Sequence, residues 1–144
     1  LETLGYAPTK ARGQNFLFEQ GVLDRIVRQA QCTAGEKVIE IGPGLGALTR
    51  TLLAAGCHVT SVELDRGFAE YIRREFAGND ALRLIEGDAL QLLPQILREQ
   101  PGAKIVANIP YNITTPLLEV ICAAAIPPAL TVLTMQKEVA ERLS

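Results

Sequence analysis

Short apolar runs alternate with longer amphipathic segments along most of this 144-residue chain. The runs are rich in valine, isoleucine and leucine and end at glycine or polar residues, as buried strands do. They predict strands at residues 37–41, 58–64, 82–86, 103–107 and 130–135. Between them, apolar residues recur every three or four positions, which indicates helices that bury one face. This spacing predicts helices at residues 19–31, 45–55, 68–76, 89–98 and 114–124, and another from 137 onward.

The helix after the fourth strand has a recognisable start signal. Thr114 or Thr115 supplies a capping hydroxyl, and Pro116 suits the first turn, where its missing N–H is not needed. Strands that alternate with helices predict an α/β fold, a Rossmann-like and mostly parallel sheet with helices on both faces. In such sheets the ligand lies beyond the carboxyl ends of the strands, near the point where strand order reverses.

Composition narrows the class of protein. With 48% apolar and 21% charged residues, the chain can bury a core, and no apolar run approaches the ~20 residues of a membrane helix. Three widely spaced cysteines match no metal-binding pattern, so we expect no metal, buried thiols and a reducing, cytoplasmic location. The net charge of −2 does not favour nucleic acid, but Lys10 and Arg12 form a locally basic amino end.

Polar or glycine signals follow each of the first four strands. Gly42, Gly44 and Gly46 form a GxGxG turn, where missing side chains allow a ligand to approach the backbone. An acid after the second strand can accept both ribose hydroxyls of a nucleotide, and both Glu63 and Asp65 are candidates, with Glu63 nearer the strand end. Glu40 could orient the glycine loop or face a cationic amino-acid group of the ligand.

Asp88 follows the third strand and favours S-adenosylmethionine over NAD. A carboxylate there can accept a hydrogen bond from the adenine amine of the ligand. Asp88 could instead cap the helix at 89–98, and both roles are compatible.

The tetrapeptide Asn108-Ile109-Pro110-Tyr111 follows the fourth strand and is the sharpest motif. The Asn108 side-chain oxygen and the Pro110 carbonyl can accept hydrogens from an aromatic amine, while Tyr111 stacks on its ring. This arrangement favours a pyramidal, more nucleophilic nitrogen that faces an activated methyl donor, so no general base is needed before transfer. The motif predicts methyl transfer to an amino group of a nucleic acid.

In this order, the motifs resemble the ribosomal RNA adenine dimethyltransferase family of the KsgA/RsmA type. The resemblance covers nearly the whole chain and rests on the following segments: 13–17 (Gly-Gln-Asn-Phe-Leu), 40–49, 63–65, 87–89, 108–116 and 135–142. It implies an S-adenosylmethionine-dependent methyltransferase fold, with S-adenosylhomocysteine as product and cofactor contacts at Gln14, Asn15, Leu17, Glu40, Gly42, Gly44, Glu63, Asp88, Ala89 and Asn108.

The family resemblance also implies a substrate and a domain boundary. The implied reaction dimethylates two adjacent adenosines near the 3′ end of small-subunit rRNA within a pre-ribosomal particle, by a monomer with a role in ribosome biogenesis. Residues 1–144 then form the cofactor-binding domain, and the last strands of the sheet and a carboxyl-terminal helical domain lie outside this chain.

Three alternatives stay open. The sister group that methylates large-subunit rRNA and confers macrolide resistance shares the Asn-Ile-Pro-Tyr type of motif, but it tends to carry lysine where Leu45 stands here. A Rossmann-type oxidoreductase would share the glycine turn, but it would not need Asp88 or the tetrapeptide. The third alternative is a ribosome-assembly factor whose docking matters more than its chemistry, and it is compatible with the dimethyltransferase interpretation.

Overall fold

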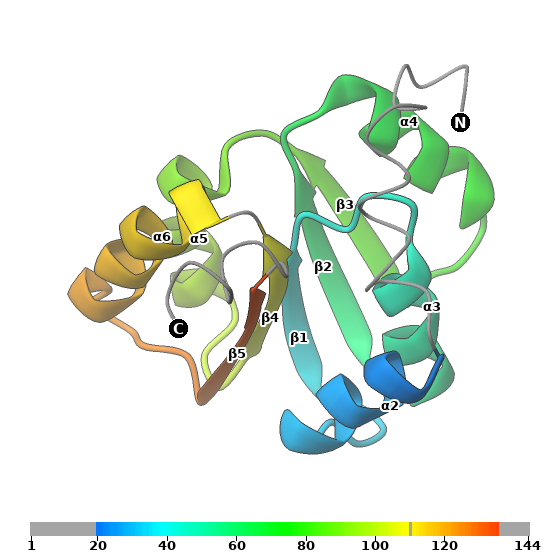
Figure 1. Cartoon of the computed structure of the whole chain (residues 1–144), viewed down its shortest axis with the longest axis horizontal. Coiled ribbons are helices and arrows are strands. Elements are labelled where there is room, and N and C mark those ends of the chain that lie inside the picture. The colour runs from blue at the N-terminus through cyan, green and yellow to red at the C-terminus, as the bar shows by residue number, and fades with distance from the viewer. Residues whose placement is uncertain (1–19, 110, 136–144) are drawn as a thin grey trace.

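The computed structural model describes residues 20–109 and 111–135, and for residues 108, 109, 111, 112 and 135 it describes the backbone alone. These residues form one parallel five-stranded sheet with helices on both faces (Figure 1). The strands are β1 (Lys37–Ile41), β2 (His58–Glu63), β3 (Leu82–Glu86), β4 (Lys104–Ile109) and β5 (Leu130–Met135), in the order β3-β2-β1-β4-β5. The predicted α/β class is confirmed, and the predicted helix from 137 onward lies outside the described residues.

The helices divide between the two faces of the sheet (Figure 1). Their bounds are α2 (Gln20–Gln29), α3 (Ala47–Ala54), α4 (Arg66–Glu75), α5 (Ala89–Glu99) and α6 (Tyr111–Ala123). One face carries α2, α3 and α4, and the other carries α5 and α6. Because each strand is covered on both sides, its side chains alternate between two apolar cores, as in other parallel sheets.

Two separate cores result from this alternation. Ile39 and Ile105 face α5 and α6, whereas Val38 and Val106 face α2 and α3, and all four are fully buried. Fully burying each such side chain contributes about 1.5–3 kcal/mol. The strands therefore stay in a fixed register, since a slip of one residue would exchange the two cores.

The predicted start of α6 is wrong. The helix begins at Tyr111, and Pro116 lies inside it rather than in its first turn. Ile113 and Leu117 both pack in the core on the α5 side, and residues four apart share a helix face only if the turn between them is already helical. Burial of these side chains offsets the missing hydrogen bond of the proline.

The cysteines differ in exposure, which corrects the prediction of buried thiols. Cys57 is buried, Cys32 is half-buried and Cys122 on α6 is exposed. All three are free thiols. Cys57 and Cys32 lie near each other against the core of α2 and α3, and burial raises the pKa of Cys32 to about 11.

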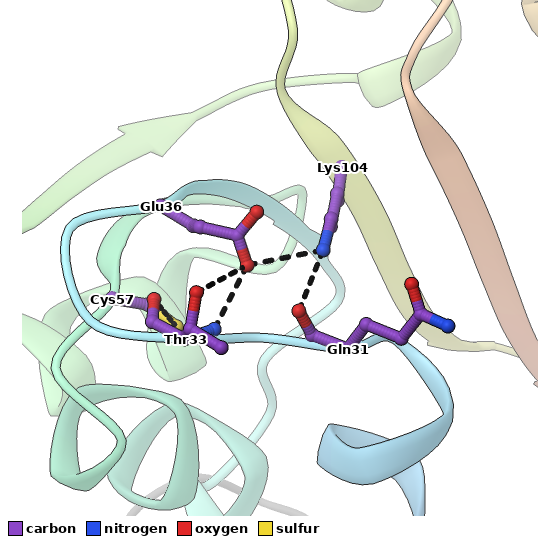
Figure 2. A network of polar contacts seen from close by, with 5 residues as sticks. All are labelled: Gln31, Thr33, Glu36, Cys57 and Lys104. Carbon is purple, nitrogen blue, oxygen red and sulfur yellow. Dashed lines mark hydrogen bonds and ion pairs between the residues drawn. The ribbon is translucent and has the colours of Figure 1, made fainter.

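At the amino-terminal edge of the sheet, a polar network connects the segment before β1 to the start of β4 (Figure 2). Lys104, at the start of β4, donates to the Gln31 carbonyl at 2.7 Å and contacts Glu36 at 3.0 Å. The segment before β1 is thereby joined to the strand that leads to the tetrapeptide 108–111.

Candidate functional site

Parallel pairing brings the chemically unusual segments to one edge of the sheet. Ile41 is in register with both Val62 and Ala107, and Glu63 is in register with Glu86. The glycine loop, Glu63, Asp88 and the 108–111 segment therefore all begin at the carboxyl edge. The chain leaves β1 for β2 on one side and returns to β4 on the other, so strand order reverses between β1 and β4. A crevice at such a reversal is the usual ligand site of open α/β sheets.

The glycine loop needs its glycines for two different reasons. Gly44 has φ 58°, and a Cβ added there would meet no atom within 4 Å, so the backbone is open to a ligand. Gly46 has φ 85°, and an added Cβ would lie 2.9 Å from Cε2 of Phe76. Gly44 is thus a position for close approach, whereas Gly46 also allows α3 and α4 to pack closely.

Glu63 holds the glycine loop against the end of β2. Its Oε1 accepts a hydrogen bond from the Gly44 N–H at 3.1 Å, and its Oε2 accepts one from the Asp65 N–H at 2.9 Å. Burial raises the pKa of Glu63, and these two backbone hydrogen bonds oppose the rise. Sequence reasoning did not foresee the contact with Gly44, because residues 19 positions apart meet only through strand pairing.

Glu63 and Asp65, the two candidate ribose acceptors, have different hydrogen-bond partners. The Asp65 carboxylate caps α4 by accepting from the Phe68 N–H at 3.0 Å. Glu63, in contrast, directs its carboxylate to the glycine loop. This geometry favours Glu63 as the acid nearer to a ligand on the loop.

Glu40 is almost completely buried, with 1% of its surface exposed. Its Oε1 accepts hydrogen bonds from Thr49 Oγ1 at 2.6 Å and from Ser61 Oγ at 2.8 Å. Burial raises the pKa of Glu40 to about 7, and the nearby Glu63 adds to the rise. Glu40 therefore lies beneath the glycine loop and joins β1, β2 and α3, rather than lining an open surface.

Asp88 is the N-cap of α5, which confirms the helix-capping role that its position predicted. Its carboxylate accepts from the Leu90 N–H at 2.9 Å, and Ala89 is the first residue of the helix. The preceding Gly87 donates its N–H to the Glu63 carbonyl at 2.9 Å. Asp88 is half-buried, so part of its surface remains accessible at the carboxyl edge.

The tetrapeptide spans the end of β4 and the start of α6. Asn108 pairs with Thr134 in the sheet, Ile109 is the last residue of β4, and Tyr111 begins α6. The side chains of Asn108 and Tyr111 lie outside the described residues, as do Pro110 and the amino-terminal candidates Gln14, Asn15 and Leu17.

Leu64 is a feature of this edge that sequence reasoning missed. It follows β2 directly and is 67% exposed, the larger exposure of two exposed large hydrophobic residues in the described part of the chain. An apolar side chain exposed between Glu63 and Asp65 suits one face of a flat ring. The signal in the sequence was a leucine between two acids at a strand end.

The described residues offer neither a metal site nor a membrane-spanning helix. Within residues 20–109 and 111–135, no group of three or more His, Cys, Asp or Glu side chains is arranged to hold a metal ion. In the same part of the chain, no helix has the length and apolar character needed to cross a membrane.

The sequence is similar to one family of known proteins. The family model described as "Ribosomal RNA adenine dimethylase" matches residues 8–144. "Ribosomal RNA small subunit methyltransferase A" of Magnetococcus marinus is 45% identical over 146 residues, which cover 100% of this chain and 52% of the relative. The protein of the same name from Hahella chejuensis is 44% identical over 118 residues, covering 81% of this chain and 43% of that one. The chain thus spans about half the length of the curated relatives it matches.

Solved structures agree with this fold. A dimethyladenosine transferase from Plasmodium falciparum matches with a TM-score of 0.71 and 31% identity, over 89% of this chain and 46% of that one. The 23S rRNA methyltransferase ErmE matches with a TM-score of 0.69 and 26% identity, over 88% of this chain and 50% of that one.

Proposed function

The chain belongs to the ribosomal RNA adenine dimethylase family, and from this premise we propose that it is the S-adenosylmethionine-binding part of an rRNA adenine N-dimethyltransferase. Its substrate is the exocyclic amine of two adjacent adenosines near the 3′ end of small-subunit rRNA. The observation that carries the proposal is the convergence of the glycine loop, Glu63, Asp88 and the backbone of Asn108 and Ile109 at one sheet edge. Family membership contradicts the alternative of a Rossmann-type oxidoreductase.

The choice of ribosomal subunit rests on similarity. The relatives at 44–45% identity carry small-subunit names, whereas the large-subunit enzyme ErmE is 26% identical. Leu45 in the glycine loop agrees with the small-subunit branch, because the large-subunit group tends to carry lysine at this position. Methylation of large-subunit rRNA is the second candidate.

The residues of the carboxyl edge fit the proposed cofactor. When bound, S-adenosylmethionine supplies an electrophilic methyl group on a positively charged sulfur. The open backbone at Gly44 leaves room for its amino-acid portion, and the Glu63 carboxylate can accept hydrogen bonds from ribose hydroxyls. The exposed Leu64 offers an apolar surface to adenine, and Asp88 can accept from the adenine amine. Gly42 and Ala89 flank these groups, and Gln14, Asn15 and Leu17 complete the proposed set.

The 108–111 segment is the proposed reader of the target base. Asn108 and the carbonyl of Pro110 accept hydrogens from the adenine amine, and Tyr111 stacks on the ring. These contacts would orient the nitrogen lone pair toward the methyl group, and correct placement can remove several kcal/mol of a transfer barrier. Because β4 pairs through Ile109, the backbone that presents this segment is held on a rigid strand end.

The proposed partner is small-subunit rRNA within a pre-ribosomal particle, in the cytoplasm, and the proposed state is a monomer. Residues 1–144 form the proposed cofactor-binding domain. Half of the length of the curated relatives lies outside this chain, so RNA engagement is proposed for the whole protein.

Calorimetric titration tests the cofactor assignment. We expect the chain to bind S-adenosylmethionine but not NADH, and we expect Asp88→Ala to lose that binding. Circular dichroism of the same samples checks that each chain is folded. A folded chain that binds NADH alone, or neither ligand, would contradict the proposal.

A second experiment tests the target-base reader. In a form of the protein that methylates small-subunit particles, Asn108→Ala should abolish transfer of a tritiated methyl group while leaving particle binding and the circular dichroism spectrum unchanged. Near-normal turnover in this variant would refute the role of Asn108.

A further inference from the structure

Two acidic side chains lie buried together beneath the proposed cofactor site. Glu40 on β1 is in register with Ser61 on β2, and Glu63 is two residues beyond Ser61, so both glutamates face the same side of the sheet. Glu40 is 1% exposed and Glu63 is 7% exposed. The pair is therefore a cluster of ionisable groups from neighbouring strands, directly below the loop that contains Gly44.

Among the described residues, the hydrogen bonds of Glu40 all go to one of its two carboxylate oxygens. Thr49 and Ser61 both donate to Oε1. Within the described part of the chain, no hydrogen bond to Oε2 is found, and no basic side chain pairs with Glu40 or with Glu63. Within residues 20–109 and 111–135, the pair thus has hydroxyl and backbone donors but no positively charged partner.

Two arginines on the helices near this edge already pair with other glutamates. Arg50 on α3 pairs with Glu75 at 3.2 Å, and Arg73 on α4 pairs with Glu86 at 3.3 Å. On the β4 side, Glu40 is in register with the apolar Val106. Among the remaining acids at this edge, Asp65 and Asp88 cap helices, and they add negative charge near Glu63.

Two buried carboxylates without a cation are costly to ionise together. Burial raises the pKa of Glu40 to about 7, and burial raises that of Glu63 as well. Near neutral pH, the free protein therefore retains a proton on this pair for part of the time. A positively charged ligand at the loop would favour the fully ionised pair and release that proton.

We propose that Glu40 is a specificity-determining residue which, together with Glu63, makes the site favour the positively charged sulfonium cofactor over its neutral thioether product. The inference rests on the proposed function and deepens it. Binding of the sulfonium form is coupled to release of a proton to solvent. When the methyl group moves to the adenine nitrogen, the sulfur becomes neutral, the nitrogen loses a proton to solvent, and the carboxylate pair takes one up.

The direction of the pH effect follows from linkage. Since the pair is protonated more in the free state than in the sulfonium-bound state, affinity for S-adenosylmethionine should rise with pH. With a free-state pKa of about 7 and full proton release, the rise from about pH 6 to about pH 7.5 is roughly eightfold. S-adenosylhomocysteine carries no charge on its sulfur, so its affinity should change little over this range.

Calorimetry of the whole chain tests the proposal, with each ligand titrated at both pH values. Repetition in buffers of different ionisation enthalpy gives the number of protons released. Glu40→Gln keeps the shape and the acceptor for Thr49 and Ser61 but cannot ionise. It should bind S-adenosylmethionine without pH dependence and show a smaller preference for it over the product. Glu70→Gln, an exposed glutamate on α4 near Arg66, is the matched control and should behave like the wild type.

A second measurement does not depend on any variant. Carbon-13 NMR of the Glu40 carboxyl group in the wild-type chain should report a fall in its pKa on addition of S-adenosylmethionine, and a smaller change with the product. Equal pH dependence for both ligands, pH dependence retained in Glu40→Gln, or an unchanged carboxyl titration would each overturn the inference alone. A folded chain that binds neither ligand would overturn both the inference and the proposed cofactor.

Discussion

Lys104 offers a sharp test of how the amino-terminal edge of the sheet supports the strand that leads to the candidate site. Lys104 is a buried residue. Its Nζ donates to the Gln31 carbonyl at 2.7 Å and contacts Glu36 Oε1 at 3.0 Å (Figure 2). The same Glu36 oxygen accepts from the Thr33 N–H at 2.8 Å. Lys104→Met would keep most of the length of the side chain and remove the charge and the donor.

The expected loss of stability follows from the two contacts that the substitution removes. A hydrogen bond from a charged donor contributes about 1.5–3 kcal/mol. The contact with Glu36 adds a smaller amount, because that carboxylate is only half-buried and water partly screens its charge. We therefore expect Lys104→Met to lower the free energy of unfolding by about 2 kcal/mol, which corresponds to roughly 4–8 °C in Tm for a chain of this size.

Urea denaturation followed by circular dichroism measures this change. Lys37→Met is the matched control, because Lys37 starts the neighbouring strand β1 and is exposed. The control should change the free energy of unfolding by less than about 0.5 kcal/mol. An equal effect of both substitutions, or a change below 0.5 kcal/mol for Lys104→Met, would refute the reasoning.

The same pair of contacts predicts a pH dependence. The hydrogen bond from Lys104 is the main cause that lowers the pKa of Glu36 below its ordinary value of 4.5. A lowered carboxyl pKa contributes stability above the unfolded-state pKa, and that contribution is lost as pH falls through the folded-state value. The stability difference between wild type and Lys104→Met should therefore shrink as the pH is lowered from about 6 to about 3. A constant difference would contradict the assigned cause.

Three further predictions concern the carboxyl edge. Gly46→Ala should destabilise the protein by about 1–3 kcal/mol in urea denaturation, because the added carbon would lie 2.9 Å from an aromatic carbon of Phe76. Gly35→Ala is the control and should cost less, since Gly35 has the same φ of 85° but no atom within 4 Å of the added carbon. Equal losses of stability in the two variants would contradict this reasoning. Asp88→Asn and Asp65→Asn should both keep their helix caps and Tm, but only Asp88→Asn should weaken S-adenosylmethionine binding by calorimetry, and equal binding would argue against the adenine contact. Burial raises the pKa of Glu40 from 4.5 to about 7, so its contribution to stability is lost as pH rises through this range. Glu40→Gln should therefore flatten the decline in Tm between about pH 4.5 and 7, and an unchanged pH profile of Tm would refute this assignment.

Most of the fold could be predicted from the chain because its cues are local. Strands β1, β3 and β5 have the predicted bounds, since each is a short apolar run between breakers. The predicted helix at 45–55 begins only at Ala47, because Gly46 has a φ of 85° that no α-helix contains. The fourth strand continues to Ile109, because Asn108 and Ile109 pair with β5, and pairing across the sheet cannot be read from one segment.

The residues of the candidate site could likewise be predicted in part from the sequence. Residue type and position after a strand predicted Gly44, Glu63 and Asp88, because strand ends of a parallel sheet converge at one edge. The family resemblance supplied the amino-terminal candidates, and their roles remain predictions. No local pattern predicted that Leu64 would be exposed or that Glu40 would be buried.

The sequence by itself determined the alternation of strands and helices, the sheet edge at which its unusual residues meet and the family to which it belongs. Only the tertiary structure decided that Glu63 bonds to Gly44, that Asp65 caps a helix and that Glu40 lies beside Glu63 without a basic partner among the described residues. The reason is physical: residue type sets which contacts are possible, whereas strand order and register set which of them form and how much water remains around each charge.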